Sequence, residues 1–576
     1  MQIEPDPKND LWAFREGRKS ISGPTLFRQL VGAVNDLCAH PTDNSLAISA
    51  LMRAGEFESA LADANCLAQA PAQQLTNALA SAFLGETTAL GGVGNLVNRI
   101  RQLEMPDLVS VSPPEGFAYY ALHPHDYAKI VERAATENDS VLVVGIRSIG
   151  TTLSAIVRAA LRQRGTTSER MTVRPTGHPY DRVADFSPEQ VQNIREWNAR
   201  VADVLVVDEG PGRSGSSFLS VAEALTRAGV PEGRITLLGS RQADGSQLCA
   251  QNGHTRWNRF RFIWPVPAAY TRFSDHIYLA DGRWREVLFQ DQSPWPACWP
   301  QMERLKFLSP DRRSLLKFEG FGYLGSEILS RAEVLAGKGF GCAAESAGDG
   351  MICYPIIRGR SLCVDDVSTE LLEHLARYCA FRAAELRTVN PPASQLPAML
   401  RFNALHEFGM EIDGKMDELS TGVPILADGR MQPHEWIRGI DGRIVKLDPY
   451  THGDDHFFPG PTDIAWDLAG AIVEWSLDDA AAEFFLSEFR RISGLDRSKA
   501  VGLYSLAYTV FRVAYWKMAL STVASSPEEQ RVLGAYQHYR VLAERQLRSM
   551  KARSVRIDSQ TTCQSAEPPL QPGTAA

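Results

Sequence analysis

The sequence predicts an α/β protein in which a parallel sheet is followed by a second region of mixed α+β type. Short apolar runs alternate with amphipathic helical segments between residues 141 and 240. Past residue 305, strand-like segments come first and long helical segments follow. Residues 24–105 show only helical spacing, which predicts a helical N-terminal extension ahead of the sheet.

The composition limits the size of the domains and the kinds of partner. A chain of 576 residues is too long for a single core. Its net charge of −8, without a long basic run, argues against a nucleic-acid-binding protein. The nine cysteines form no CxxC pair, which favours reduced thiols over disulfides or zinc. With no signal peptide and no apolar run of membrane-spanning length, we expect a cytoplasmic protein without membrane contact.

The N-terminal extension, residues 1–105, contains "SLAISALMRAGEFESALADANCLA", in which apolar residues recur at helical spacing. Part of this segment resembles the helices of repeat proteins, so a partner-binding surface is one interpretation of the extension. A single copy does not define a repeat.

The parallel sheet is expected within residues 106–270. There "SVLVVGI" precedes "TTLSAIVRAALRQRG", "DVLVVDE" precedes "SFLSVAEALTRAGV", and "RITLLGS" follows. Uninterrupted apolar strands, each followed by a helix that ends near glycine, are typical of a parallel sheet buried on both faces.

The remaining boundaries follow from changes in composition. Residues 271–304 are expected to form a linker, because "QDQSPWPACWPQ" (290–301) is rich in proline and tryptophan; an ordered surface brace is the alternative. Residues 305–552 combine strand-like segments such as "GMICYPIIRG" with long helices. The tail, residues 553–576, has few apolar residues and is expected to be disordered.

A first candidate site lies in "VLVVDEGPGRSGSS" (204–217), where a buried strand ends on two carboxylates and a loop of small residues. In open α/β sheets, ligands bind at the carboxyl ends of the strands, where Asp208 and Glu209 lie. Small residues let backbone N–H groups approach an anion, and the following helix adds partial positive charge. The two acids would face hydroxyls or a bound Mg²⁺, whereas the loop would hold an anion. A sugar phosphate offers both hydroxyls and an anionic group.

This stretch resembles the phosphoribosyl-pyrophosphate (PRPP) signature of type I phosphoribosyltransferases. The resemblance implies that Asp208 and Glu209 contact the ribose hydroxyls as catalytic residues. Upstream, "VVGIRSIGTTLSA" (143–155) is similar to the family's pyrophosphate loop. The residues that the resemblance assigns to PRPP are Arg147, Ser148, Gly150, Gly212, Arg213, Ser214, Gly215, Ser216 and Ser217. The alternative is a Rossmann-like sheet whose glycines only make turns.

A polar segment, "RPTGHPYDR" (174–182), lies between the two strands. Such a segment could close over a reacting pyrophosphate, with arginines neutralising charge and His178 as a candidate general base. A solvated loop with internal salt links is the alternative.

A second candidate site begins in "SLLKFEGFGYLGSEILSRAEVLAGKGF", which places Lys317 in a strand and Glu327 in the following helix. "RIVKLDPYTHGDDHFF" and "PTDIAWDLAGAIVEW" come later. The series resembles the aminoglycoside and choline phosphotransferase branch of the protein-kinase-like fold, over roughly 305–550. This implies a bilobal α+β domain in which Lys317 holds the ATP phosphates and pairs with Glu327, or with Glu333, while Asp448 binds Mg²⁺.

The same resemblance implies that Asp463 and Asp467 are structural and brace the catalytic loop. That loop has the family pattern His-Gly-Asp-Leu-His-Pro-x-Asn, and "MQP" (431–433) aligns with Leu-His-Pro. Arg430 then occupies the position of the catalytic base, and a cation cannot accept a proton. Asp428, two residues earlier, is the candidate replacement, and Glu435 replaces the metal-binding asparagine.

One further motif, "HGDDHFF" (452–458), follows Asp448. Its adjacent carboxylates would extend the Mg²⁺ environment or bind a cationic substrate, and zinc is less favoured.

These observations favour a bifunctional transferase, phosphoribosyltransferase-like and small-molecule-kinase-like, that uses PRPP, ATP and Mg²⁺ on a nucleoside, base or related metabolite. The alternative is a nucleotide- or PRPP-sensing regulatory protein with a degenerate kinase domain, which Arg430 favours. In a third reading, Lys317 and Asp448 are ordinary surface residues. The expected partners are small-molecule substrates, and a homodimer is possible because phosphoribosyltransferases commonly form dimers.

Overall fold

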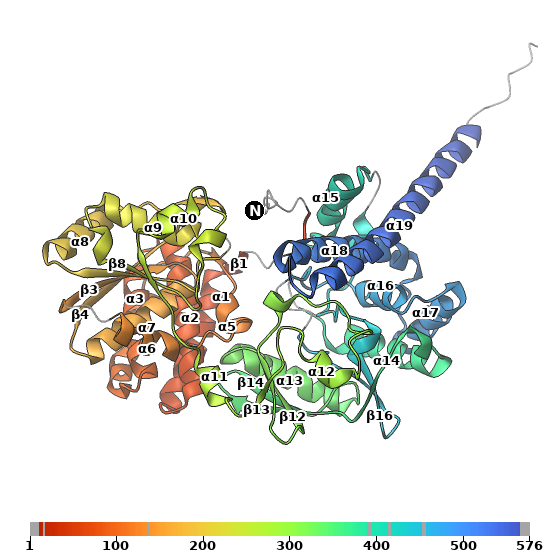
Figure 1. The fold of residues 1–576 in the computed structure, drawn as a ribbon, viewed down its shortest axis with the longest axis horizontal. Coiled ribbons are helices and arrows are strands. Elements are labelled where there is room, and N and C mark those ends of the chain that lie inside the picture. Colours follow the sequence, from red (N-terminus) through yellow and green to blue (C-terminus); the bar gives the residue numbers. More distant parts are fainter. Residues whose placement is uncertain are drawn as a thin grey trace, which may run out of the picture.

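The computed structural model describes residues 11–14, 18–134, 138–212, 214–388, 393–412, 416–451 and 457–564, with side chains up to residue 551 apart from that of Gln247. Figure 1 shows two parts side by side, one built around a parallel sheet and one with two lobes. The first part contains the N-terminal half of the chain. The second ends in a long helix that extends away from the body.

The N-terminal helices pack against the parallel sheet and do not stand apart from it. Helix α2 is buried along most of its length, and a buried ion pair between Glu58 and Arg170 (2.8 Å) joins it to the edge strand β4. Asp43 caps this helix by accepting hydrogen bonds from two backbone N–H groups of its first turn. The elements of this region are β1 (Lys19–Ser22), α1 (Gly23–Ala39), α2 (Asn44–Asp63), α3 (Gln69–Phe83), α4 (Val93–Arg101), β2 (Leu108–Val111), α5 (Glu115–Ala118) and α6 (Pro124–Arg133).

The predicted parallel sheet is present and has five strands in the order β4-β3-β7-β8-β9. Side chains alternate across it: Val141 and Val143 face the N-terminal helices, whereas Leu142 and Val144 face α8 and α9. Burial on both faces explains the uninterrupted apolar runs. The elements are β3 (Ser140–Ile146), α7 (Ile149–Gln163), β4 (Thr167–Val173), β5 (Thr176–His178), β6 (Asp181–Val183), α8 (Pro188–Ala199), β7 (Asp203–Val207), α9 (Ser216–Arg227), β8 (Ile235–Leu238), α10 (Gly253–Trp257), β9 (Arg261–Ile263) and α11 (Ala268–Arg272).

The second part begins with a five-stranded antiparallel sheet in the order β10-β11-β12-β14-β13. Its strands and neighbouring helices are β10 (Ile277–Tyr278), α12 (Arg285–Leu288), β11 (Lys306–Leu308), β12 (Ser314–Phe318), α13 (Tyr323–Gly337), β13 (Glu345–Gly348) and β14 (Met351–Pro355). Phe307, Leu316, Phe318 and Met351 belong to the same apolar core as the N-terminal helices. The two parts therefore share a core.

Residues 271–304, expected to be a linker, contribute one short strand to this sheet. They supply the edge strand β10 and, after it, the long connection to β11. The sequence did not reveal β10 because a strand of two residues has no periodicity.

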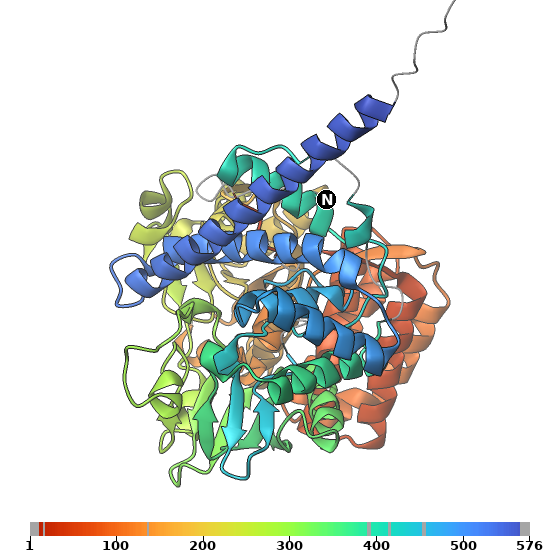
Figure 2. The same ribbon diagram turned by 90° about the vertical axis from the view of Figure 1, so that its right-hand side faces the viewer.

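The helical lobe carries a small sheet in the order β15-β16-β17 and the longest helices of the chain. Figure 2 shows α18 and α19 crossing the lobe at the end opposite the antiparallel sheet. The elements are β15 (Gly359–Ser361), α14 (Thr369–Glu385), α15 (Leu396–Phe408), β16 (Trp436–Gly439), β17 (Ile444–Lys446), α16 (Ala465–Glu474), α17 (Asp479–Ser493), α18 (Ser498–Val523) and α19 (Glu529–Gln564).

The C-terminal boundary differs from the expected one, since α19 continues through residue 553 to Gln564. Among the described helices, not one combines the length and the apolar character needed to cross a membrane. The eight cysteines whose side chains are described are all free thiols, as the spacing predicted.

Candidate functional sites

The first site lies where the strand order of the parallel sheet reverses. From β3 the chain passes outward to β4, whereas β7 lies on the other side of β3 and leads to β8 and β9. The loops after β3 and β7 therefore meet at a switch point, the usual ligand position in such sheets. At Gly150, a Cβ would lie 2.6 Å from the carbonyl oxygen of Val207, so only glycine permits this approach.

The acidic pair follows β7 directly. Asp208 is partly buried, and its Oδ1 accepts a hydrogen bond from the backbone N–H of Glu209 (2.8 Å). Burial raises the pKa of Asp208 to about 7. The Tyr127 hydroxyl donates to the Asp208 carbonyl oxygen (2.6 Å) from α6 and fixes the backbone here. The site thus holds a carboxyl group that titrates near neutral pH.

The predicted phosphate loop leads into α9. Gly215, at the helix N-cap, has φ +68°, a conformation that favours glycine. The hydroxyls of Ser214 and Ser216 both donate to the Pro179 carbonyl oxygen in the turn of the β5–β6 hairpin, at 2.8 and 2.6 Å. The hairpin that was expected to close over a ligand therefore already contacts the loop.

The other predicted residues of this loop are less constrained. Gly212 is exposed with φ +53°, and Ser217 lies partly buried in the first turn of α9. Arg213 lies outside the described residues. His178, the candidate base, is in β5, where its Nδ1 accepts from the Tyr180 N–H at 3.3 Å.

The predicted pyrophosphate loop is covered by α2. The carboxylate of Asp63, the last residue of α2, forms ion pairs with Arg147 (3.1 Å), Arg174 (2.7 Å) and Arg18. Burial alone would raise the pKa of Asp63, but the hydrogen bond and charge of Arg174, aided by the other two arginines, lower it. Arg147, predicted to face pyrophosphate, is thus bound to a carboxylate of the protein.

Ser148, also assigned to this loop, has the unusual backbone angle φ +106°. Its N–H donates to the Ser59 hydroxyl on α2 (3.2 Å), and its own hydroxyl accepts from Arg174 (2.9 Å). A non-glycine residue in such a conformation costs about 1–3 kcal/mol and is found most often at functional sites. The strain and the arginines mark this loop as a candidate anion site.

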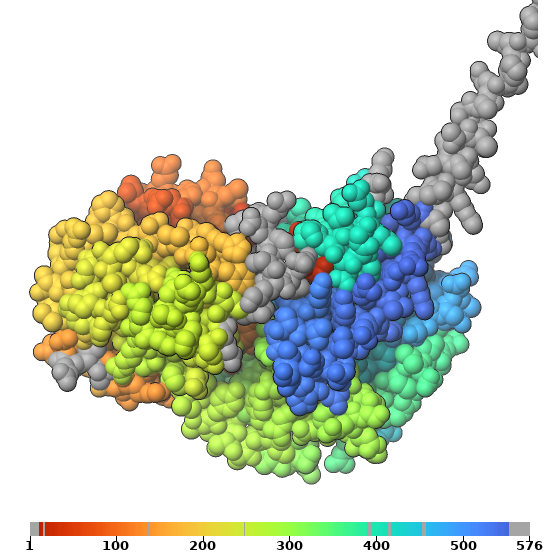
Figure 3. Space-filling model, turned by 45° about the horizontal axis from the view of Figure 1, so that its top comes forward, coloured from red at the N-terminus to blue at the C-terminus, as the bar shows by residue number. Residues whose placement is uncertain are grey.

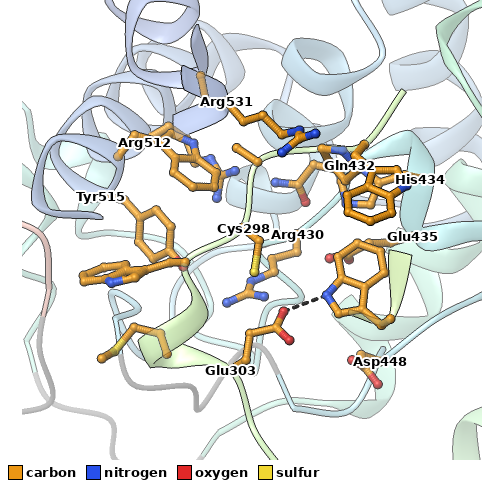
Figure 4. A pocket seen from close by; sticks show the side chains of 18 of the residues that line it. Cys298, Glu303, Arg430, Gln432, His434, Glu435, Asp448, Arg512, Tyr515 and Arg531 are labelled. Carbon is orange, nitrogen blue, oxygen red and sulfur yellow. Dashed lines mark hydrogen bonds between the residues drawn. The ribbon is translucent and has the colours of Figure 1, made fainter. Parts of the chain in front are cut away.

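The second site is a cavity of about 480 Å³ between the antiparallel sheet and the helical lobe. Figure 4 shows Asp448 and Glu435 on one side of it and Arg512 and Arg531 on the opposite side, with Arg430 between them. Cavities of this size hold metabolite-sized ligands.

Lys317 projects into this cavity from β12. Its Nζ forms ion pairs with Asp448 (3.0 Å) and with Glu319 (3.1 Å), two residues further along the chain. The predicted pair with Glu327 is not among the ion pairs of the described residues. Glu319 takes that position because alternate residues of an extended chain project on the same side.

The loop that was aligned with the catalytic loop is held by Asp467 of α16. This carboxylate accepts hydrogen bonds from the backbone N–H groups of Asp428 (2.9 Å) and Gly429 (2.8 Å). The expected bracing role of Asp467 is confirmed. Asp463 instead pairs with Arg497 (3.0 Å) and caps the start of α16 through Ala465 N–H (2.9 Å).

Asp428 does not reach the cavity, contrary to the expectation that it replaces the base. It is completely buried, accepts a hydrogen bond from the Tyr378 hydroxyl, and lies 3.5 Å from Lys446 Nζ. Its Oδ1 also accepts a hydrogen bond from the Arg430 N–H (3.3 Å), and Asp428 is not among the residues that line the cavity. Arg430, Gln432 and Glu435 of this loop line the cavity, and Figure 4 shows Arg430 near its middle.

The two candidate metal ligands, Glu435 and Asp448, both line the cavity. Glu435 is bonded to Lys446 Nζ (2.6 Å), and Asp448 is bonded to Lys317. Among the described residues no group of three or more His, Cys, Asp or Glu side chains could hold a metal by itself. Two carboxylates nevertheless fit Mg²⁺, which usually binds to one or two of them together with phosphate and water. Residues 452–456, most of "HGDDHFF", lie outside the described residues.

The connection between β10 and β11, residues 279–305, forms another wall of the cavity. It contributes Trp284, Trp295, Cys298, Trp299 and Glu303, and the Trp284 indole N–H donates to Glu303 (2.8 Å). In the space-filling view this light-green segment borders the blue helices α18 and α19 (Figure 3). The sequence placed no functional residue here, although the density of tryptophan was a signal.

No family model and no curated protein matches the chain. Among solved structures, choline kinase LicA from Streptococcus pneumoniae is 14% identical, with 43% of this chain and 89% of that chain covered and a TM-score of 0.30. Macrolide 2'-phosphotransferase MphH from Brachybacterium faecium is also 14% identical, with 41% of this chain and 88% of that chain covered and a TM-score of 0.29. The GDP complex of aminoglycoside 2'-phosphotransferase-IIIa is 14% identical, with 48% of this chain and 98% of that chain covered and a TM-score of 0.30. These TM-scores and identities are low, so the roles of individual residues depend on this chain's own geometry.

Proposed function

We propose that the two-lobed part is a kinase-like domain whose cavity binds the phosphates of ATP. The observation that carries this proposal is the ion pair between Lys317 and Asp448, both of which line the cavity. A strand lysine beside a loop aspartate is the arrangement with which kinase-like proteins hold nucleotide phosphates and their metal. The bracing of the Asp428–Gly429 backbone by Asp467 supports the same assignment.

Asp448 and Glu435 are the residues that would hold Mg²⁺, which would neutralise the phosphate charge. In the described structure each carboxylate is neutralised by a lysine, Lys317 or Lys446. Lys317 would then shift from Asp448 to the nucleotide phosphates.

We infer that this domain binds nucleotide but transfers phosphate poorly. The resemblance aligns Arg430 with the catalytic base, and Arg430 lines the cavity, whereas Asp428 is buried and is not among the lining residues. A cation there would attract phosphate but could not take a proton from an acceptor hydroxyl.

Replacing Lys317 by methionine is expected to weaken the binding of Mg-ATP about 10- to 100-fold, because a charge-assisted phosphate contact is worth about 1.5–3 kcal/mol. Isothermal titration calorimetry measures the affinity. Lys338→Met, at an exposed position after α13, is the matched control and should bind as the wild type does. Equal affinity of the Lys317→Met variant and the wild type would contradict the assignment.

A second candidate function concerns the parallel sheet: we propose that it is a phosphoribosyltransferase-type site that binds PRPP. The acidic pair Asp208–Glu209 at the switch point, packed against the loop after β3, favours it. The diphosphate of PRPP would compete with Asp63 for Arg147 and Arg174. The whole chain would then be a transferase with two phosphate-ligand sites.

The binding of PRPP should strengthen between pH 6 and pH 8. A carboxyl with a pKa near 7 is about one-tenth ionised at pH 6 and about nine-tenths ionised at pH 8, and the ionised form accepts from ribose hydroxyls. The ionised fraction of this carboxyl thus rises about 10-fold from pH 6 to pH 8. Calorimetry at the two pH values should therefore show a rise in affinity of up to about 10-fold. Asp208→Asn should bind more weakly and lose this part of the pH dependence, whereas the exposed Asp185→Asn should not. Identical profiles for Asp208→Asn and the wild type would exclude Asp208 from the site.

A further inference from the structure

Arg512 of α18 is a buried cation whose hydrogen-bonding capacity is mostly unused. Its side chain lines the cavity, and the residue is 6% exposed. Its hydrogen bond within the described structure is a long one from Nη2 to the Tyr539 hydroxyl (3.5 Å), and Nε has no partner. The Arg512 guanidinium carbon lies 5.4 Å from the ring centre of Tyr515 and 5.3 Å from that of Trp516. These cation–π contacts stabilise the positive charge but supply no hydrogen-bond acceptor for the N–H groups.

The nearest carboxylate does not satisfy this arginine. Glu474 lies 3.8 Å from Arg512 Nε, beyond hydrogen-bonding distance. Its oxygens accept instead from the hydroxyls of Tyr508 and Tyr539. A buried guanidinium without a bonded acceptor is costly, so an anion is expected beside it.

Arg531 of α19 lines the same end of the cavity. Its Nη1 makes long contacts with Glu528 (3.3 Å) and with the Pro527 carbonyl oxygen (3.4 Å). Glu528 is engaged more closely by Arg285, through two bonds of 2.6 and 3.0 Å. Arg531 therefore retains N–H donors for a ligand, and Figure 4 shows it, like Arg512, in the upper part of the cavity.

The other acids that line the cavity are matched to other cations. Glu303 pairs with Lys306 (3.1 Å), Glu435 with Lys446, and Asp448 with Lys317. The end of the cavity between α18 and α19 consequently holds two arginines, Arg512 and Arg531, against one further lining carboxylate, that of Glu474. Gln432, buried at the same wall, has an Oε1 without a hydrogen-bond partner and could contact a polar group of a ligand.

We propose that this end of the cavity binds the oxyanion group of a small molecule, a phosphate monoester or a carboxylate, between Arg512 and Arg531. This deepens the proposed kinase-like function, on which it rests, by naming an anionic second ligand beside the nucleotide. Guanidinium groups suit both oxyanions because their paired N–H donors match two oxygens. A cationic ligand would meet like charge here.

Titration of the full chain with inorganic phosphate, acetate and choline chloride at constant ionic strength tests this proposal. Saturable phosphate or acetate binding is expected by calorimetry, and which of the two binds separates a phosphate from a carboxylate ligand. Arg531→Gln, at a partly exposed position, should weaken that binding about 10-fold or more, and Arg512→Lys should do the same. Arg491→Gln, in an exposed pair with Glu488, should have no effect.

Three outcomes would overturn the proposal: no saturable binding of either anion, binding of choline instead, or anion binding that Arg531→Gln leaves intact. Lys317→Met separates this proposal from the nucleotide assignment. Anion binding that survives Lys317→Met and is lost in Arg531→Gln supports the arginine site, even if the wild type fails to bind Mg-ATP. Anion binding that is lost only in Lys317→Met places the anion at the nucleotide end and contradicts the proposal. Thermal melting of each unliganded variant confirms that it is folded.

Discussion

Replacing Asp467 by alanine is expected to lower the free energy of unfolding by about 3–5 kcal/mol, the usual cost of removing one partner of a buried ion pair. Asp467 is fully buried. It lies 3.5 Å from the buried Arg382 and accepts the N–H groups of Asp428 and Gly429. The substitution leaves a guanidinium and two backbone donors without this acceptor, and water cannot reach them.

Urea denaturation followed by circular dichroism measures this loss. Asp467→Asn should be intermediate, because the amide oxygen still accepts one N–H but carries no charge for Arg382. Glu488→Gln removes an exposed ion pair with Arg491 and should change the stability little. If Asp467→Ala unfolds at the wild-type urea concentration, Asp467 does not hold the loop.

The parallel sheet could be predicted because its strands are buried on both faces. Val204–Val207 and residues 141–146 consist of apolar side chains without alternation, and helical periodicity follows each run. The acidic pair after β7 and the loop after β3 could be placed at one edge because parallel strands end on the same side. These are local signals that a single sequence contains.

The partners of the candidate residues could not be predicted, because they are distant in the chain. Asp63 lies 84 residues before Arg147 and 111 before Arg174, and no spacing rule connects an acid on a helix to loops so far away. Helical periodicity identified α2 but not the loop that it covers. Glu319 was missed for a different reason: the resemblance led to a helix glutamate, whereas a residue just past the end of β12 makes the pair.

Arg512 did leave a signal in the sequence. It stands in "LAYTVFRVAYWKMAL" (506–520), where it interrupts an apolar helical run on its buried face. A charged residue at such a position must find a partner or a ligand. What the run does not show is which segments complete the cavity, since residues 279–305 and α19 come from distant parts of the chain.

Arg430→Asp is expected to raise ATP turnover about 100-fold or more, since a positioned general base contributes about 10²–10⁴-fold to a rate. The other residues of the proposed phosphotransferase site lie around this position. Lys317 and Asp448 are paired, Glu435 lines the same cavity, and Asp467 holds the loop backbone. The substitution replaces a cation with a proton acceptor. It therefore supplies a general base within the existing cavity.

Release of inorganic phosphate from Mg-ATP, with water as acceptor, measures this gain. Arg430→Gln is the matched control, because it removes the positive charge without supplying a base. Equal turnover of the two variants would show that the charge of Arg430, and not the lack of a base, limits the reaction. Rapid turnover by the wild type would show that another group already serves as the base. A rise in turnover that occurs only in Arg430→Asp would mean that the cavity has the geometry for phosphoryl transfer. The side chain at position 430 would then decide whether the domain only binds ATP or also hydrolyses it.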